Sequence, residues 1–299
     1  MMTEDDLPAG QHAAQATGLT AAPTAALTAG PATGAGCAGP GGGDPALTED
    51  GFLGNRLRVR QPRTGFRAGA DSVLLAAAVP AAPGQRVLEL GCGAGVASLC
   101  LGVRVPNLDL HAVERQPDYA QLAQENAMRN QIALHVACAD LAALPPFLRT
   151  EFDHVLANPP YFVPGAGTQA RDPGREAALR EETPLQLWLD VARRRLRPGG
   201  WLTLIQLASR LPDVLAALGG GLGSVSVLPL AARQGRAAGR VIVRARKGGK
   251  APFQLLAPLV LHASPQHLHD GADLSDDANL VLANGGAIDL LGHTKIFDP

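Results

Sequence analysis

The sequence has few cysteines, and their spacing indicates neither a metal site nor a disulfide framework. Its four cysteines show no CxxC pair and no Cys/His cluster, and they stand at Cys37, Cys92, Cys100 and Cys138. Structural zinc sites and small disulfide-rich folds need closely spaced ligands or paired cysteines. We therefore expect no metal and no disulfides, which fits a reducing compartment such as the cytoplasm.

Long apolar runs are also missing. A membrane-spanning helix needs about 20 apolar residues, whereas the stretch 72–83 is shorter and is interrupted by Pro80 and Pro83. The N-terminus is acidic at positions 4 to 6, where a secretory signal carries basic residues. We expect neither a membrane span nor a signal peptide, and a hydrophobic content of 46% is enough for a packed globular core.

Lysine and arginine are absent from the first 50 positions. This segment carries six acidic side chains and is otherwise rich in Ala, Gly, Thr and Pro. Such a composition buries too little apolar surface to offset chain entropy, so we expect residues 1–48 to form a disordered tail. The rest of the chain has 26 basic residues against the other 21 of the 27 acidic ones, so it is mildly basic.

Lysine is scarce, because only three of the 26 basic residues are lysine and the others are arginine. The run 231–250 has seven basic residues and no acidic one. It predicts a surface for a polyanion such as RNA, with a solvated face that binds nothing as the open alternative. The predicted RNA-binding residues are Arg233, Arg236, Arg240, Arg246 and Lys247.

Strand and helix patterns alternate through the middle of the chain. Strand-like runs occupy 85–90, 108–114, 132–140 and 152–158, with helical patterns between the first three. This alternation predicts an α/β fold with a mostly parallel sheet. Two later strand patterns, 223–230 and 240–246, have no long helix between them and predict an antiparallel edge. We expect a lead-in of a strand pair and a helix at 49–84, a core at 85–250, and a C-terminal extension, 251–299, packed on the core.

A glycine-rich turn, ELGCGAG at 89–95, follows the first core strand. Closely spaced glycines between a strand and a helix let the backbone approach a ligand. Gly91, Gly93 and Gly95 are spaced G-x-G-x-G, and Val96 stands where the dinucleotide motif G-x-G-x-x-G has its third glycine. This spacing suits a ligand without a pyrophosphate, although close packing of a helix on a strand would also select such a turn.

Acidic residues end the next two strand patterns. Glu114 lies 19 residues beyond Gly95, where a carboxylate is placed to accept the hydroxyls of a ribose. Asp140 is placed to accept a hydrogen bond from the amine of an adenine. Each acid alone is more often a cap or a surface group. Three such features on successive strand ends favour an adenosine ligand, and S-adenosylmethionine is the leading candidate.

The fourth strand ends in Asn-Pro-Pro-Tyr, residues 158–161. The Asn158 side-chain carbonyl and the Pro159 carbonyl are acceptors whose directions the prolines fix, and both can accept hydrogens from one planar amino group. The Tyr161 ring can lie against the base that carries this amine. Aligned acceptors would orient the nitrogen lone pair and stabilise the positive charge that grows during transfer. A rigid turn that only closes the strand is the alternative.

These motifs together resemble class I S-adenosylmethionine-dependent methyltransferases that modify amines. The stretch FRAGADSVLLAAAV, residues 66–79, with the later motifs resembles the tRNA(Val) adenine-N6 methyltransferase family over about residues 52–250. The resemblance implies a seven-stranded Rossmann-like sheet, S-adenosylmethionine as cofactor and an adenine in the anticodon-loop region of tRNA as substrate. Ala70 departs from the family, because relatives often have a polar residue there.

Carried over position by position, the resemblance implies two sets of site residues. The glycines would line the methionine end of the cofactor with help from Asp71, Glu114 would hold the ribose, and Asp140 the adenine. The predicted cofactor-binding set is Asp71, Glu89, Gly91, Cys92, Gly93, Gly95, Glu114, Asp140, Leu141 and Asn158. The predicted catalytic set is Asn158, Pro159, Pro160 and Tyr161.

Other functions stay open on the sequence alone. A glutamine methyltransferase that acts on a release factor also carries Asn-Pro-Pro-Tyr, because an amide nitrogen poses the same geometric problem. A DNA adenine methyltransferase is disfavoured, since we find no separate target-recognition domain. Nothing favours an inactive binding module. A nicotinamide dehydrogenase is disfavoured by the glycine spacing.

Overall fold

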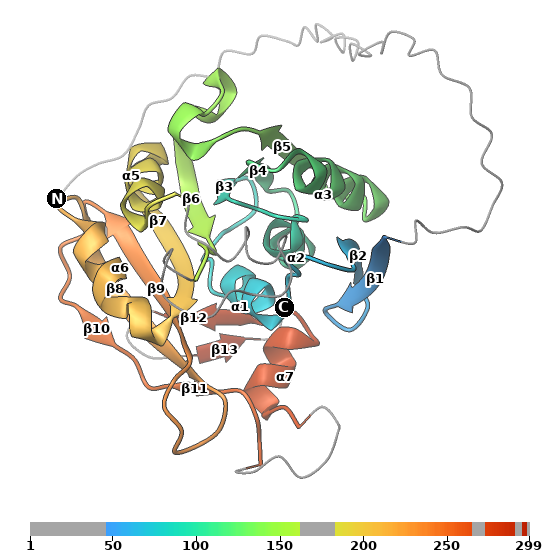
Figure 1. Ribbon diagram of the computed structural model, residues 1–299. Coiled ribbons are helices and arrows are strands. Elements are labelled where there is room, and N and C mark those ends of the chain that lie inside the picture. Colours follow the sequence, from blue (N-terminus) through green and yellow to red (C-terminus); the bar gives the residue numbers. More distant parts are fainter. Residues whose placement is uncertain (1–45, 162–182, 265–272, 291–294, 298–299) are drawn as a thin grey trace, which may run out of the picture. The chain divides into compact units, whose positions relative to one another are not determined.

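The predicted sheet is present in the computed structural model, which describes residues 46–161, 183–264, 273–290 and 295–297. Its main strands are β3 (Arg86–Leu90), β4 (Asp109–Glu114), β5 (Leu134–Cys138), β6 (Phe152–Ala157), β7 (Leu196–Leu207), β8 (Leu222–Ala231) and β9 (Arg240–Lys247). Two short strands, β10 (Gln254–Leu255) and β11 (Leu259–Val260), also belong to it. The order is β10-β8-β9-β7-β6-β3-β4-β5, and β11 also pairs with β8 (Figure 1).

The α/β fold class is confirmed. Strand β9 runs antiparallel to β7 and β8, and the other pairs in this sheet are parallel. Among the described residues the sheet has nine strands, where the sequence predicts seven. The difference comes from β10 and β11, which have two residues each and add to the outer edge of β8. Strands that short leave no alternating pattern in the sequence.

Helices cover both faces of the sheet, as the alternation predicts (Figure 1). They are α1 (Ala70–Ala77), α2 (Val96–Arg104), α3 (Pro117–Arg129), α5 (Leu185–Arg195), α6 (Leu211–Leu218) and α7 (Asp276–Leu282), with the 3-10 turns η1 (Leu141–Ala143), η2 (Pro146–Leu148) and η3 (Ala208–Arg210). One core cluster joins α1, α2 and α7 to the sheet, and a second joins α5 and α6 to it. None of the helices in the described part of the chain is long and apolar enough to cross a membrane.

A hairpin of β1 (Leu47–Phe52) and β2 (Leu57–Pro62) precedes the sheet. Its outer edge is bound by two asparagine side chains, Asn126 of α3 and Asn130, the residue that follows this helix. The Asn126 amide exchanges two hydrogen bonds with the backbone of Arg60, at 2.8 and 3.0 Å, and the Asn130 amide does the same with Arg58, at 3.0 and 2.8 Å. The lead-in is therefore fixed to the helix that follows Glu114.

One boundary of the predicted tail needs correction. Strand β1 begins at Leu47, inside the segment 1–48 that the composition predicts to be disordered. Leu47 packs against the core, and the Thr48 hydroxyl donates to the Gln61 carbonyl, so the last two residues of that segment are held in the strand. Residues 1–45 lie outside the described residues. The C-terminal extension adds α7 and the pair β12 (Ala287–Asp289) and β13 (Lys295–Phe297).

Candidate active site

The predicted motifs meet at the carboxyl edge of the sheet because their strands are in register. Ala157 at the end of β6 pairs with Leu90 at the end of β3, and Leu90 pairs with Val113 near the end of β4. The residues that follow, Asn158 and the glycine turn, therefore emerge side by side. Ligands of open parallel sheets bind at this edge.

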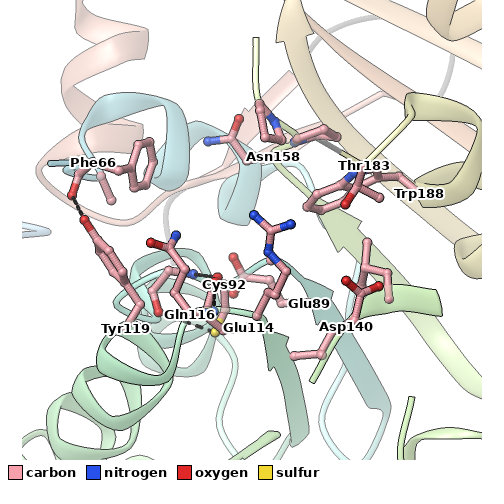
Figure 2. A pocket seen from close by; sticks show the side chains of 18 of the residues that line it. Phe66, Glu89, Cys92, Glu114, Gln116, Tyr119, Asp140, Asn158, Thr183 and Trp188 are labelled. Atoms are coloured by element: carbon pink, nitrogen blue, oxygen red, sulfur yellow. Dashed lines mark hydrogen bonds between the residues drawn. The ribbon is translucent and has the colours of Figure 1, made fainter. Parts of the chain in front are cut away.

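A pocket opens there, and Figure 2 shows the side chains that surround it. The Asn158 amide and the Phe66 ring lie at one end, and Glu114 and Asp140 lie at the other. Of the predicted site residues, the pocket is lined by Glu89, Gly91, Cys92, Gly93, Glu114, Asp140, Leu141, Asn158, Pro159, Pro160 and Tyr161. The structure thus brings the cofactor and acceptor motifs to one cavity.

The glycine turn comes close to its neighbours. Gly91 has φ +65° and donates its N–H to the Val113 carbonyl at 2.8 Å. A methyl group on Gly91 would lie 2.4 Å from the end of the Trp188 ring. Glycine is needed at this position for two reasons, a left-handed backbone and the absence of room for a side chain.

Glu114 is preorganised by the backbone around it. It is 7% exposed, one carboxylate oxygen accepts from the Gly93 N–H and the other from the Gln116 N–H, both at 2.9 Å. Each oxygen keeps a further lone pair, and Glu114 lines the pocket. Paired acceptors of this kind fit the two hydroxyls of a ribose, so this end of the pocket suits S-adenosylmethionine.

Replacement of Glu114 by Gln should weaken cofactor binding by about 10- to 100-fold, because one acceptor becomes a donor and the charge is lost. Titration calorimetry with S-adenosylhomocysteine measures this loss. Glu125→Gln, a change of the same kind on the exposed side of α3, is the matched control. Equal affinities in the Glu114 variant and the wild type would contradict a ribose site at Glu114.

Asp140 caps the turn that follows β5. One of its carboxylate oxygens accepts from the Ala142 N–H at 2.8 Å, which fixes the side chain beside the pocket. Asp140 therefore has the capping role that the sequence analysis gave as the alternative to a ligand-binding role. It occupies one oxygen and leaves the other for an adenine amine, so both roles are compatible. Leu141 is buried next to it and supplies an apolar wall.

Glu89 is a buried carboxyl group beside the glycine turn. It is 3% exposed and accepts from the backbone N–H of Ser98 at 2.9 Å and from the Ser98 hydroxyl at 2.5 Å. Burial raises the pKa of Glu89 to about 7, and the nearby Glu114 charge acts in the same direction, while the Ser98 bonds oppose it. The folded protein thus holds this proton more tightly than the unfolded chain.

The raised pKa of Glu89 predicts a pH-dependent stability. Between pH 4.5 and 7 the folded state binds more protons at this group than the unfolded state, so its contribution falls as pH rises, by about 3 kcal/mol in total. Glu89→Gln removes this group from the titration. Urea unfolding at pH 5 and pH 7.5 should show a smaller drop for the variant than for the wild type, and equal drops would contradict the assignment.

The Asn-Pro-Pro-Tyr loop holds the one feature that carries the chemical interpretation. The Asn158 side-chain oxygen is buried and has no hydrogen-bond partner among the residues that the structure describes. A buried acceptor without a partner is costly and requires an explanation, and the amine of a bound substrate would supply one. Phe162, which follows Tyr161 at the end of this loop, lies outside the described residues.

Gln206 supports this loop and is a residue that the sequence analysis missed. It stands near the end of β7, is 0% exposed, and its side-chain amide donates to the Pro159 and Pro160 carbonyls, both at 3.4 Å. A carbonyl oxygen has two lone pairs, so Pro159 can still accept from a ligand. A polar residue inside the apolar strand pattern LTLIQL was the signal that could have identified it.

Other missed residues form the walls of the pocket. Phe66 and Tyr119 lie on one side of it, where the Tyr119 hydroxyl donates to the Phe66 carbonyl at 2.8 Å (Figure 2). Trp188 lies on α5, 7% exposed, against Gly91. It is one of only two tryptophans in the chain, but an aromatic residue on an amphipathic helix looks the same in sequence whether it lines a pocket or a core.

Two predicted cofactor residues do not line the pocket. Gly95 has φ +86°, is the residue before α2, and approaches Ala123 of α3. The Asp71 carboxylate accepts from the Tyr161 hydroxyl and from Arg240. The arrangement therefore gives no support to a contact between Asp71 and the methionine moiety.

The predicted RNA-binding residues are separated by the structure. Arg240 pairs with Leu207 at the carboxyl edge, whereas Arg246 pairs with Trp201 in the middle of β7. Lys247, beyond Arg246, donates to the Leu196 carbonyl at 2.5 Å. The run is a single strand with a turn before it, so it does not form one surface beside the pocket.

The two remaining basic residues of this set lie in the turn before β9. The Arg233 guanidinium forms an ion pair with Asp273 at 2.8 Å, and Arg236 is exposed. Arg236 and the partly exposed Arg233 thus lie at the end of β9 that is nearer the pocket edge. Their contact with RNA stays a prediction.

The sheet has helices on both faces, and the pocket at its carboxyl edge joins a glycine turn to an Asn-Pro-Pro-Tyr loop. Together these features define a class I methyltransferase. The model of the family described as "Methyltransferase small domain" matches residues 67–229. The chain belongs to this family. The predicted class, an S-adenosylmethionine-dependent methyltransferase, is confirmed.

Individual relatives agree with this placement. The chain is 30% identical over 206 residues to the tRNA1(Val) (adenine(37)-N6)-methyltransferase of Actinobacillus succinogenes, covering 67% of this chain and 85% of that protein. It is 31% identical over 202 residues to the enzyme of the same name from Aeromonas hydrophila, with 66% and 84% covered. A solved structure, a predicted O-methyltransferase from Agrobacterium tumefaciens, matches with a TM-score of 0.54 and 27% identity over 66% of this chain and 90% of that one.

Proposed function

We propose that this methyltransferase modifies the N6 amine of an adenine in the anticodon-loop region of tRNA. The observation that carries the proposal is the buried, unpartnered side-chain oxygen of Asn158 beside the Pro159 carbonyl. Two relatives are named as enzymes that act on adenine 37 of tRNA1(Val), which supports transfer to nitrogen and a tRNA substrate.

The residues of this chain would divide the work between the two ends of the pocket. Glu114 and Asp140 would hold the ribose and the adenine of S-adenosylmethionine, which supplies an electrophilic methyl group when bound. At the other end the Asn158 oxygen and the Pro159 carbonyl would accept the two hydrogens of the target amine. This contact directs the nitrogen lone pair and stabilises the charge that develops on nitrogen.

A loop adenine fits this site better than a paired one. The amine must enter the pocket between Asn158 and Tyr161, so the base has to leave its stack. Bases in a tRNA loop are already partly unstacked, which lowers this cost. A cytoplasmic location, where such tRNA is modified, stays a prediction.

The test is radiolabelled methyl transfer to tRNA transcribed in vitro, which carries no modification, followed by digestion to nucleosides. The expected product is N6-methyladenosine, formed from an anticodon-loop adenine. Label in another nucleoside would contradict the adenine assignment. Label in a release factor offered as a competing substrate, with none in tRNA, would support the glutamine methyltransferase instead.

Binding of the same tRNA at several salt concentrations is a second measurement. An RNA interface releases counterions, so affinity should fall steeply as salt rises. An enzyme whose methyl acceptor is a protein would have no such interface, so its affinity for tRNA should depend less on salt. Affinity for tRNA that does not change with salt would count against the proposal.

A further inference from the structure

Tyr161 is held by two residues from distant parts of the chain. Its hydroxyl donates to one carboxylate oxygen of Asp71, in the first turn of α1, at 2.7 Å. The same oxygen accepts from the Nε of Arg240, the first residue of β9, at 3.1 Å. The carbon of the Arg240 guanidinium lies 4.6 Å from the centre of the Tyr161 ring.

We infer that Asp71 and Arg240 are positioning residues that hold Tyr161 as the stacking surface for the target base. Arg240 covers one face of the ring, so the base is left with the other. The three side chains form a closed triangle in which each contacts the other two, and we call it the Tyr161 clamp. Its members lie 90 and 169 positions apart in the chain.

The contacts explain why arginine stands at position 240. A planar guanidinium can stack on a ring while its edge donates to a carboxylate, and an ammonium group cannot do both. The Arg240 side chain is 34% exposed and Asp71 30%, so solvent screens the charges only in part. The second contact of Arg240 is from Nη1 to the Gly239 carbonyl at 3.3 Å, inside its own turn. These two contacts use the Nε donor and one donor of Nη1.

The state of the Tyr161 phenol agrees with the clamp. Burial raises the pKa of Tyr161, and the charge of Asp71 and its hydrogen bond act in the same direction. The hydroxyl is therefore a donor at every pH at which the enzyme works. A ring fixed at its hydroxyl by Asp71 and at one face by Arg240 has little freedom to rotate.

The inference rests on the proposed function for the tRNA measurement, and it is tested by a double-mutant cycle. Arg240→Lys should lower kcat/KM for tRNA roughly 3- to 30-fold while cofactor affinity stays unchanged. In a Tyr161→Leu background, which lacks the ring and the hydroxyl, Arg240→Lys should have no further effect. Arg197→Lys is the matched control, because Arg197 also pairs with an aspartate, Asp153, at the far end of the sheet.

A direct contact between Arg240 and RNA gives the opposite result. Lysine keeps the charge, so the loss would be small, and it would be the same with or without the Tyr161 ring. If the losses of kcat/KM caused by Arg240→Lys and Tyr161→Leu multiply in the double variant, the two side chains act independently and the clamp is overturned.

A second measurement needs no activity and separates failure of the clamp from failure of the proposed function. The chain has only two tyrosines, so 3-fluorotyrosine labelling gives two fluorine signals, which Tyr119→Phe assigns. Arg240→Lys should shift the Tyr161 signal, and Arg197→Lys should leave it in place. An unmoved signal in Arg240→Lys would overturn the inference even if tRNA is methylated, and a shifted signal without tRNA methylation would leave the clamp intact.

Discussion

Asn158→Ala should lower kcat for methyl transfer by about 100- to 1000-fold, because it removes an acceptor that is aligned with the charge developing on nitrogen. The unpartnered oxygen is the group that the substitution deletes. Cofactor affinity should change little, since Glu114 and Asp140 lie at the other end of the pocket. Single-turnover kinetics with tRNA, and calorimetry with S-adenosylhomocysteine, measure the two quantities separately.

The control for this experiment is Asn279→Ala. Asn279 lies exposed on α7, so its loss should change neither measurement. Unchanged turnover in Asn158→Ala would remove the amine contact from the mechanism. A parallel loss of cofactor binding would show that Asn158 acts through the cofactor and not through the acceptor.

Gly91→Ala should destabilise the protein by about 2–5 kcal/mol. A left-handed backbone costs an alanine about 1–2 kcal/mol, and an overfilled site adds about 1–3 kcal/mol. Both conditions hold here, with φ +65° and a new methyl group 2.4 Å from the Trp188 ring. Urea unfolding measures the loss, and the same variant should bind S-adenosylhomocysteine more weakly because the turn must shift.

Gly84→Ala separates the two contributions. Gly84 has φ +82°, but a methyl group there meets nothing within 4 Å, so only the backbone cost of about 1–2 kcal/mol is expected. Trp188→Phe removes the part of the ring that the methyl group would strike. Gly91→Ala should therefore cost less in the Trp188→Phe background. Equal costs at Gly84 and Gly91 would show that the ring moves aside freely.

The features that sequence predicted well are those that lie within a few residues of one another. The glycine turn and Asn158–Tyr161 each follow a strand directly, and parallel strands bring their ends to one edge. Locating the end of one strand was enough to predict Glu114. About half of the residues that line the pocket were named from short-range patterns of this kind.

The contacts that sequence could not predict join distant residues. Nothing in the sequence links Arg240 to Asp71, so a basic residue in a basic run was interpreted as a contact for RNA. The same run holds Arg246, which stacks near Trp201 with its guanidinium carbon 5.4 Å from the ring centre, far from Arg240 along β9. Periodicity tells which face of a strand a side chain occupies, but the neighbours depend on pairing across the whole sheet.

Asn126 and Asn130, at the end of α3, also bear on which edge of the hairpin is open to another strand. A two-stranded hairpin exposes a row of backbone donors and acceptors that could recruit a strand from another copy. The Asn126 and Asn130 amides already occupy the donors and acceptors of Arg60 and Arg58. Side-chain amides thus take the place that a third strand would have, and this border of the hairpin is closed to intermolecular pairing.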